Sequence, residues 1–173
     1  MTSKLPVLAS ATATLLFGLL AGPAAAGTSA DTVQVTANVT ATCSIATAAL
    51  AFGAYDPVVA NASLPDDATG SIVVRCTKGA SGIFIDLDGG KHNAGTQRQM
   101  VHGTNAGVLL PYEVYKETGR SSVWGAGDNG TTNSVADGSG DDVSVVMYGR
   151  IPAAQTQAIS GSYTDTLVST IHF

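Results

Sequence analysis

The stretch DTVQVTANVTATCSIA, residues 31–46, alternates between polar and apolar residues at every step from Thr32 to Ile45. Within that range the odd-numbered positions carry Val, Ala, Cys and Ile, whereas the even-numbered positions carry Thr, Gln, Asn and Ser. A period of two with one polar face is typical of a half-buried strand. The stretch therefore predicts extended β structure that buries one of its two faces.

The composition favours the same fold class over the rest of the chain. The 173 residues include 20 Gly, and Glu occurs only at Glu113 and Glu117. Strong helix formers are scarce after residue 26, whereas Thr, Val, Ser and Gly, which favour strands and turns, abound. We expect an all-β protein.

The number of expected strands is one short of a complete sandwich. A constant-type immunoglobulin sandwich has about seven strands, and we count six that could form its core. The printed chain stops at Phe173, so no further strand is expected after the last of them. A short additional strand is possible near Gln97–Val101. The six expected strands are residues 41–46, 70–77, 83–88, 108–116, 143–150 and 163–173.

The N-terminal part of the chain, in contrast, contains an expected strand that is not among these six. Residues 31–40 run into the next strand without Gly or Pro between Thr28 and Phe52, so a tight hairpin is disfavoured. This segment is either the first half of a long edge strand in its own domain or a strand added to a neighbouring molecule. Residues 27–40 could reach about 45 Å when extended, which is enough to span to a neighbour.

The first 26 residues have the pattern of a removable secretory signal. Met1–Lys4 is a short basic start, Leu5–Leu20 is apolar, and residues 24–26 are a small-residue cleavage motif. Export favours a disulfide between the two cysteines, Cys43 and Cys76, which both fall on the apolar face of their strands. We expect this bridge to lie buried between two strands.

The charge and the chemistry of the side chains exclude several function classes. The formal net charge of −5 argues against nucleic-acid partners, which require Lys and Arg. No apolar run after the signal approaches the roughly 20 residues of a membrane span. We expect no enzyme, no cofactor and no metal, because no Gly-x-Ser-x-Gly motif occurs and the histidines lack close ligand spacing. The histidines are His92, His102 and His172.

Calcium binding is the one metal alternative that the sequence leaves open. Asp86-x-Asp88-Gly89-Gly90 is similar to the start of a calcium loop but lacks the third acidic position and the closing Glu. Asp137, Asp141 and Asp142 could bind calcium weakly, although acidic clusters mostly face solvent. We favour a solvated loop.

A set of short motifs is spread over residues 41–173. They are Cys43 with Ile45, Phe52-Gly53-x-Tyr55-Asp56, Gly70-x-Ile72-x-Val74-x-Cys76-Thr77, Asp86-x-Asp88-Gly89-Gly90, Arg98-x-Met100, Tyr112-x-Val114-Tyr115, Trp124-Gly125, Gly149-x-Ile151-Pro152-x-x-Gln155 and Gly161-x-Tyr163-x-Asp165-Thr166. No single motif is specific, but in their order and spacing the chain resembles the spore coat protein U domain family, which includes pilins of the archaic chaperone–usher pathway.

The resemblance implies an incomplete immunoglobulin-like β-sandwich of the pilin type, which lacks its last strand. It also implies a structural subunit that polymerises by donor-strand complementation. It implies a signal peptide at residues 1–26, a donor-strand extension at 27–40 and a sandwich domain at 41–173. The expected partners are identical or related pilus subunits, a periplasmic chaperone and an outer-membrane usher, and the expected location is a surface fimbrium reached through the periplasm. The fibre would support adhesion and biofilm formation.

The resemblance also assigns side chains to the two partners in strand exchange. The donor side chains would be Val33, Val35, Ala37 and Val39. The acceptor-groove core would be Ile72, Val74, Ile85, Leu87, Val145, Met147, Leu167, Ile171 and Phe173. Two other functions stay open: a spore or cell-envelope coat protein of the same fold, and a monomeric extracellular binding domain that closes its own sandwich with residues 31–40.

Overall fold

The computed structural model describes residues 26–125, 130–135 and 137–173, and the chain divides into two units, residues 1–37 and 38–173. The expected signal peptide lies outside the described residues except for Ala26. Residues 26–37 form neither helix nor strand, and the side chains of Val33 and Val35 are exposed. In the described ranges no helix has the length and apolarity to cross a membrane.

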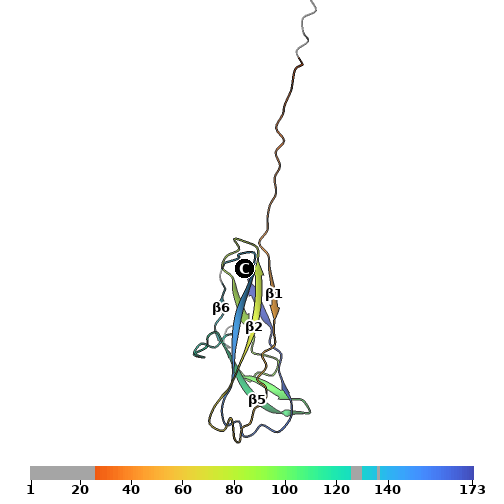
Figure 1. Cartoon of the computed structure of the whole chain (residues 1–173). Coiled ribbons are helices and arrows are strands. Elements are labelled where there is room, and N and C mark those ends of the chain that lie inside the picture. The colour runs from red at the N-terminus through yellow and green to blue at the C-terminus, as the bar shows by residue number, and fades with distance from the viewer. Residues whose placement is uncertain (1–25, 126–129, 136) are drawn as a thin grey trace, which may run out of the picture. The chain divides into compact units, whose positions relative to one another are not determined.

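The second unit is built from two antiparallel sheets (Figure 1), which confirms the predicted all-β class. In the described residues the larger sheet has six strands in the order β1-β2-β7-β5-β4-β8, and the smaller has three in the order β6-β3-β9. The strands of the larger sheet are β1 (Cys43–Thr47), β2 (Asp66–Cys76), β7 (Asp142–Ile151), β5 (Asn105–Tyr115), β4 (Arg98–His102) and β8 (Tyr163–Thr164). Those of the smaller sheet are β6 (Asn133–Ser134), β3 (Phe84–Leu87) and β9 (Ser169–His172).

The expected strand at residues 163–173 is wrong as a single element. It is two short strands in different sheets, since β8 pairs with β4 and β9 pairs with β3. Between them, side-chain carboxylates accept hydrogen bonds beside two backbone bonds, from Asp88 N–H to the Val168 carbonyl and from Lys91 N–H to the Thr166 carbonyl. The backbone N–H of Val168 donates to Asp88 Oδ1 at 2.9 Å, and Asp165 accepts hydrogen bonds from the segment after β3. The chain therefore crosses from one sheet to the other.

The apolar core lies where the predicted parity placed it. Alternate residues of β2, β3, β5 and β7 point to one side and are almost fully buried, as a period of two requires. Trp124 is completely buried, and its indole N–H donates to the Ile85 carbonyl at 2.9 Å, which joins the loop after β5 to the smaller sheet. The members of the core include Ile72, Val74, Cys76, Ile83, Ile85, Leu87, Leu110, Tyr112, Val114, Met147 and Ile151.

One cation, Arg98, is fully buried within this core. Its guanidinium pairs with Glu113 and donates to the Asp88 carbonyl at 2.6 Å and to the Trp124 carbonyl at 2.8 Å. A buried charge is tolerable only when it is paired and hydrogen-bonded. Arg98 thus connects β4, β5, the end of β3 and the Trp124 loop.

Replacing Arg98 with Gln should lower the free energy of unfolding by about 3–5 kcal/mol, because the substitution breaks a buried ion pair. The matched control is Arg75→Gln, whose partner Asp142 lies 2.8 Å away on an exposed surface. An exposed pair contributes about 0–1 kcal/mol, so the control should change little. Equilibrium urea unfolding measures both variants, and equal destabilisation by the two would contradict this account.

Candidate strand-acceptor groove

Each sheet of the second unit ends in a strand that has only one partner in the described part of the chain. β1 pairs with β2 alone, and β9 pairs with β3 alone. The outer edge of such a strand presents backbone N–H and C=O groups that no ladder satisfies. β8 and β6 also end their sheets, but the edges of β1 and β9 are the two that lie beside the groove described next.

A groove of about 450 Å³ lies between the segment that follows β1 and the segment that leads into β9. We call it the β1–β9 groove. One wall is formed by residues 47–50 and the other by residues 163–167, with Ser169 of β9 beyond. Ile72, Leu87 and Met147 lie at its base, so the groove opens directly onto the buried core. A side chain that entered it would contact apolar atoms of both sheets.

A second hollow of about 760 Å³ adjoins this groove. Its lining comes mainly from residues 50–57 and 158–163, and it shares Leu50, Phe52, Met100 and Tyr163 with the β1–β9 groove. The two depressions are therefore neighbouring parts of one surface feature rather than independent sites. The shared residues form the divide between them.

The predicted acceptor residues fall into three groups. Val74 and Ile85 are fully buried core residues outside the groove lining, and Val145 and Ile171 are partly buried against the same core. Phe173 is 56% exposed at the C-terminus. The residues that line the β1–β9 groove are Ile72, Leu87, Met147 and Leu167. The acceptor role of all nine stays a prediction.

The predicted donor side chains are all exposed. Val33, Val35 and Val39 have 87%, 89% and 80% of their surface accessible, and Ala37 is exposed as well. Exposed large apolar residues at a regular spacing of two are unusual for a solvated segment. The donor assignment likewise stays a prediction.

Sequence reasoning did not assign one wall of the groove. Leu50 and Phe52 are apolar and share a parity, opposite to that of Cys43 and Ile45, and this spacing was the available signal. They fit against β7 because position 149 is glycine: a Cβ there would lie 2.8 Å from the side chains of both Leu50 and Phe52. The other lining residues that the acceptor prediction omitted include Met100, Tyr112 and Tyr163.

The C-terminal wall of the groove is fixed by a buried carboxylate. The Tyr112 hydroxyl donates to Asp165 Oδ2 at 2.7 Å, and the backbone N–H of Lys91 donates to Asp165 Oδ1 at 3.0 Å. The imidazole Nδ1 of His92 lies 3.1 Å from the same Oδ1. Burial, together with the hydrogen bond to Asp165, raises the pKa of Tyr112, so its hydroxyl stays protonated and acts as the donor.

Gly90 makes room for this carboxylate. Its φ is +85°, and a Cβ at that position would collide with the side chain of Asp165. The pattern Asp88-Gly89-Gly90, which the sequence analysis weighed as a calcium motif, thus packs against residues 165–168. Asp88 Oδ1 accepts from the backbone N–H groups of Gly90 and Val168.

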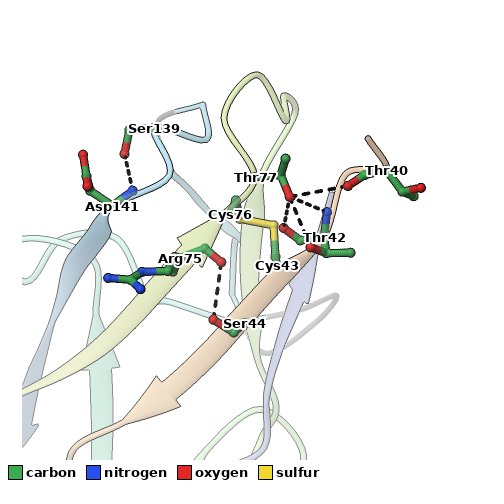
Figure 2. Close-up of a disulfide and its surroundings, with 9 residues drawn as sticks. All are labelled: Thr40, Thr42, Cys43, Ser44, Arg75, Cys76, Thr77, Ser139 and Asp141. Atoms are coloured by element: carbon green, nitrogen blue, oxygen red, sulfur yellow. Dashed lines mark hydrogen bonds between the residues drawn. A yellow bond between two sulfur atoms is a disulfide. The ribbon is translucent and has the colours of Figure 1, made fainter. Parts of the chain in front are cut away.

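The start of β1 is fixed by a disulfide (Figure 2). Cys43 and Cys76 are directly paired in the β1–β2 register, with Cα atoms 4.1 Å apart, and their sulfurs are bonded. The predicted bridge is confirmed. Because β1 is an edge strand held by one neighbour, the bridge prevents its first residue from separating from β2.

Among the described residues no group of three or more His, Cys, Asp or Glu side chains is arranged to hold a metal ion. His92 and His172 each lie beside one carboxylate, that of Asp165 and that of Asp86. The nearly buried His102 packs against the Tyr163 ring.

Comparison with known proteins identifies the family. Residues 29–170 match the Spore Coat Protein U domain. The chain belongs to this family. It is 36% identical over 162 residues to Protein U of Myxococcus xanthus, a match that covers 87% of this chain and 88% of that protein. The family resemblance predicted from the motifs is confirmed.

A solved structure shows the fold. The chain is similar, with a TM-score of 0.56 and 20% identity, to a chain in the CsuC–CsuE chaperone–tip adhesion subunit pre-assembly complex from archaic chaperone–usher Csu pili of Acinetobacter baumannii. The match covers 78% of this chain and 40% of that one. The predicted pilin-type fold class is thereby confirmed.

Replacing Tyr112 with Phe should loosen the groove wall, because Asp165 then lacks one donor in a nearly dry site. We expect a loss of about 1–3 kcal/mol in unfolding free energy and faster amide exchange at Leu167 and Val168. Tyr148→Phe is the control, since that ring lies beside Arg120 on a different surface. Hydrogen exchange measured by mass spectrometry tests both, and unchanged exchange at residues 165–168 in Tyr112→Phe would contradict the role of Asp165.

Proposed function

We propose that the protein is a structural subunit of a secreted surface fibre of the archaic chaperone–usher type, assembled by donor-strand complementation. The observation that carries the proposal is an open apolar groove beside two sheet edges in a chain whose front segment carries exposed, alternating valines. The family supports a structural role, and the similarity to a pilus subunit complex supports the same fold. In this proposal residues 27–40 of one copy fill the groove of the next.

The free energy of strand addition combines two gains with one cost. Burial of three Val side chains contributes about 5–9 kcal/mol before any entropy cost. Each backbone hydrogen bond to the β1 or β9 edge adds about 0.5–1.5 kcal/mol net. Ordering the donor segment opposes these gains at about 1–2 kcal/mol per residue. A net stabilisation therefore requires that both the side-chain and the backbone contacts form.

The donor pattern and the groove are complementary in character. The groove has apolar residues at its base, and its edges carry unpaired backbone groups, so it suits a strand with one apolar face and one polar face. Ala37 is the smallest of the four donor side chains and would suit a shallow part of the groove. Val33, Val35 and Val39 would fill the deeper parts.

The route and the partners of the subunit follow from the same proposal. Residues 1–26 would direct export to the periplasm and be removed there. A periplasmic chaperone would cover the groove, and an outer-membrane usher would exchange the chaperone for the next subunit. The finished fibre would lie at the cell surface and support adhesion and biofilm formation.

A second candidate is a coat protein of a spore or cell envelope. It is favoured by the 36% identity to Protein U, a match that extends over most of both chains. The same strand exchange would join copies into a layer instead of a fibre. Electron microscopy of cells stained with an antibody to the chain separates the two, because fibres project from the cell and a coat follows its surface.

Replacing Val35 with Asp should abolish the heat-stable multimers that a donor-strand polymer forms, because a charge would enter an apolar groove. Thr36→Asp is the matched control: it places the same charge one residue further along, on the polar face of the donor. We expect it to retain multimers. Gel electrophoresis without boiling, together with electron microscopy of fibres, measures both variants.

Deletion of residues 27–40 provides the stricter test. The shortened chain should fold with its Cys43–Cys76 bridge intact and stay monomeric. Multimers that persist after the deletion would refute donor-strand assembly by this segment.

A further inference from the structure

We infer that Thr77 is a positioning residue that stops the chain from filling its own groove and so reserves residues 27–40 for a neighbouring copy. The inference rests on the proposed function and adds a mechanism to it. A donor segment joined to its own acceptor domain is always present at high effective concentration. Self-closure would therefore outcompete assembly unless the connection between donor and domain opposes it.

If residues 27–40 filled the groove of their own domain, which we call self-closure, the strand register would decide which residues form the hairpin loop. To bury its valines beside Cys43 and Ile45, the segment must return along β1 with Val39 opposite Cys43. The loop is then residues 40–42. A loop one residue shorter would pair Thr40 with Cys43 and turn every valine to the outer face, because side chains alternate with a period of two. Self-closure in the register that buries the valines thus needs a loop of at least three residues, formed by Thr40, Ala41 and Thr42.

These residues are held in a different arrangement (Figure 2). The backbone N–H of Thr77 donates to the Thr42 carbonyl at 2.9 Å, and the N–H of Thr42 donates to Thr77 Oγ1 at 3.1 Å. The Thr77 hydroxyl also lies 3.2 Å from the Thr42 carbonyl oxygen and 3.5 Å from that of Thr40. These contacts continue the β1–β2 ladder one residue beyond the disulfide.

The Thr77 hydroxyl is needed as the acceptor for the Thr42 N–H because the Thr77 carbonyl already accepts another hydrogen bond. In a regular antiparallel ladder the N–H of Thr42 could donate to the carbonyl of Thr77. That carbonyl instead accepts from Ala80 at 3.0 Å, in the turn that follows β2. The side chain of Thr77 supplies the missing acceptor, which valine, of nearly the same shape, could not do.

The place of Thr42 in the β1–β2 ladder is incompatible with a place in a hairpin loop. A three-residue hairpin loop usually ends in a residue with left-handed backbone conformation, most readily Gly. Thr42 would occupy this place, yet the non-glycine residues with positive φ in the described chain are Arg120 and Ala154. Closing the hairpin would therefore require Thr42 to leave Thr77 and to adopt a disfavoured conformation.

The experiment compares Thr77→Val with Thr77→Ser in the mature chain. Serine keeps the hydroxyl and should behave like the wild type. Valine should raise the ratio of self-closed to open monomer about two- to tenfold, which corresponds to the loss of about one hydrogen bond. Hydrogen exchange of the peptide that covers residues 33–39, measured at high dilution just after refolding, reports self-closure as concentration-independent protection. Heat-stable multimers formed at higher concentration should decrease in parallel.

A second pair of variants keeps the test decisive if Thr77→Val is poorly folded. Thr42→Gly supplies the loop glycine and leaves Thr77 in place, whereas Thr42→Gly with Thr77→Val removes both obstacles. The double variant should show more protection of residues 33–39 than Thr42→Gly alone.

Two results would overturn the inference while multimers of the wild type still support donor-strand assembly. One is equal protection in Thr42→Gly and the double variant, and the other is equal behaviour of Thr77→Val and Thr77→Ser. A wild type that forms no multimers at any concentration would instead refute the proposed function and, with it, this inference.

Discussion

The unpaired outer edges of β1 and β9 are the constraint on which the rest of the structure depends. Every buried backbone N–H and C=O group needs a partner, and edge strands of a sheet leave half of theirs without one. In this chain the two edges lie on opposite sides of an apolar groove whose base is the core itself. A strand placed there would form hydrogen bonds with the backbone groups of the edges and cover the apolar base of the groove. No single side chain could do both.

The sequence predicted the parts of the fold that depend on parity. Alternation identified β2, β3, β5 and β7 and placed Ile72, Leu87 and Met147 on the inner face, because side-chain direction in a strand is set by a period of two. The disulfide followed from the same parity, since Cys43 and Cys76 both fall on the apolar face. The short strand β4 was also anticipated near its observed position.

Features that depend on tertiary hydrogen bonds could not be predicted in this way. The break between β8 and β9 is set by Asp88 and Asp165, whose carboxylates accept backbone N–H groups from distant segments. Nothing in the local pattern distinguishes these aspartates from solvated ones. The wall formed by Leu50 and Phe52 depends on the absence of a side chain at Gly149, about a hundred residues away in sequence. Pairing across such separations is decided by the whole fold.

An apolar groove that faces solvent is expected to close, since closing it would bury more apolar surface. Its walls are instead held by contacts that collapse would break. The C-terminal wall is tied through Asp165, whose side chain is 2% exposed and would lose donors in a dry site if it moved. At the other end, the disulfide and the Thr77 hydroxyl hold the start of β1 against β2. Because the restraints are polar or covalent and lie at the ends, the apolar middle stays available to a strand that brings its own valines.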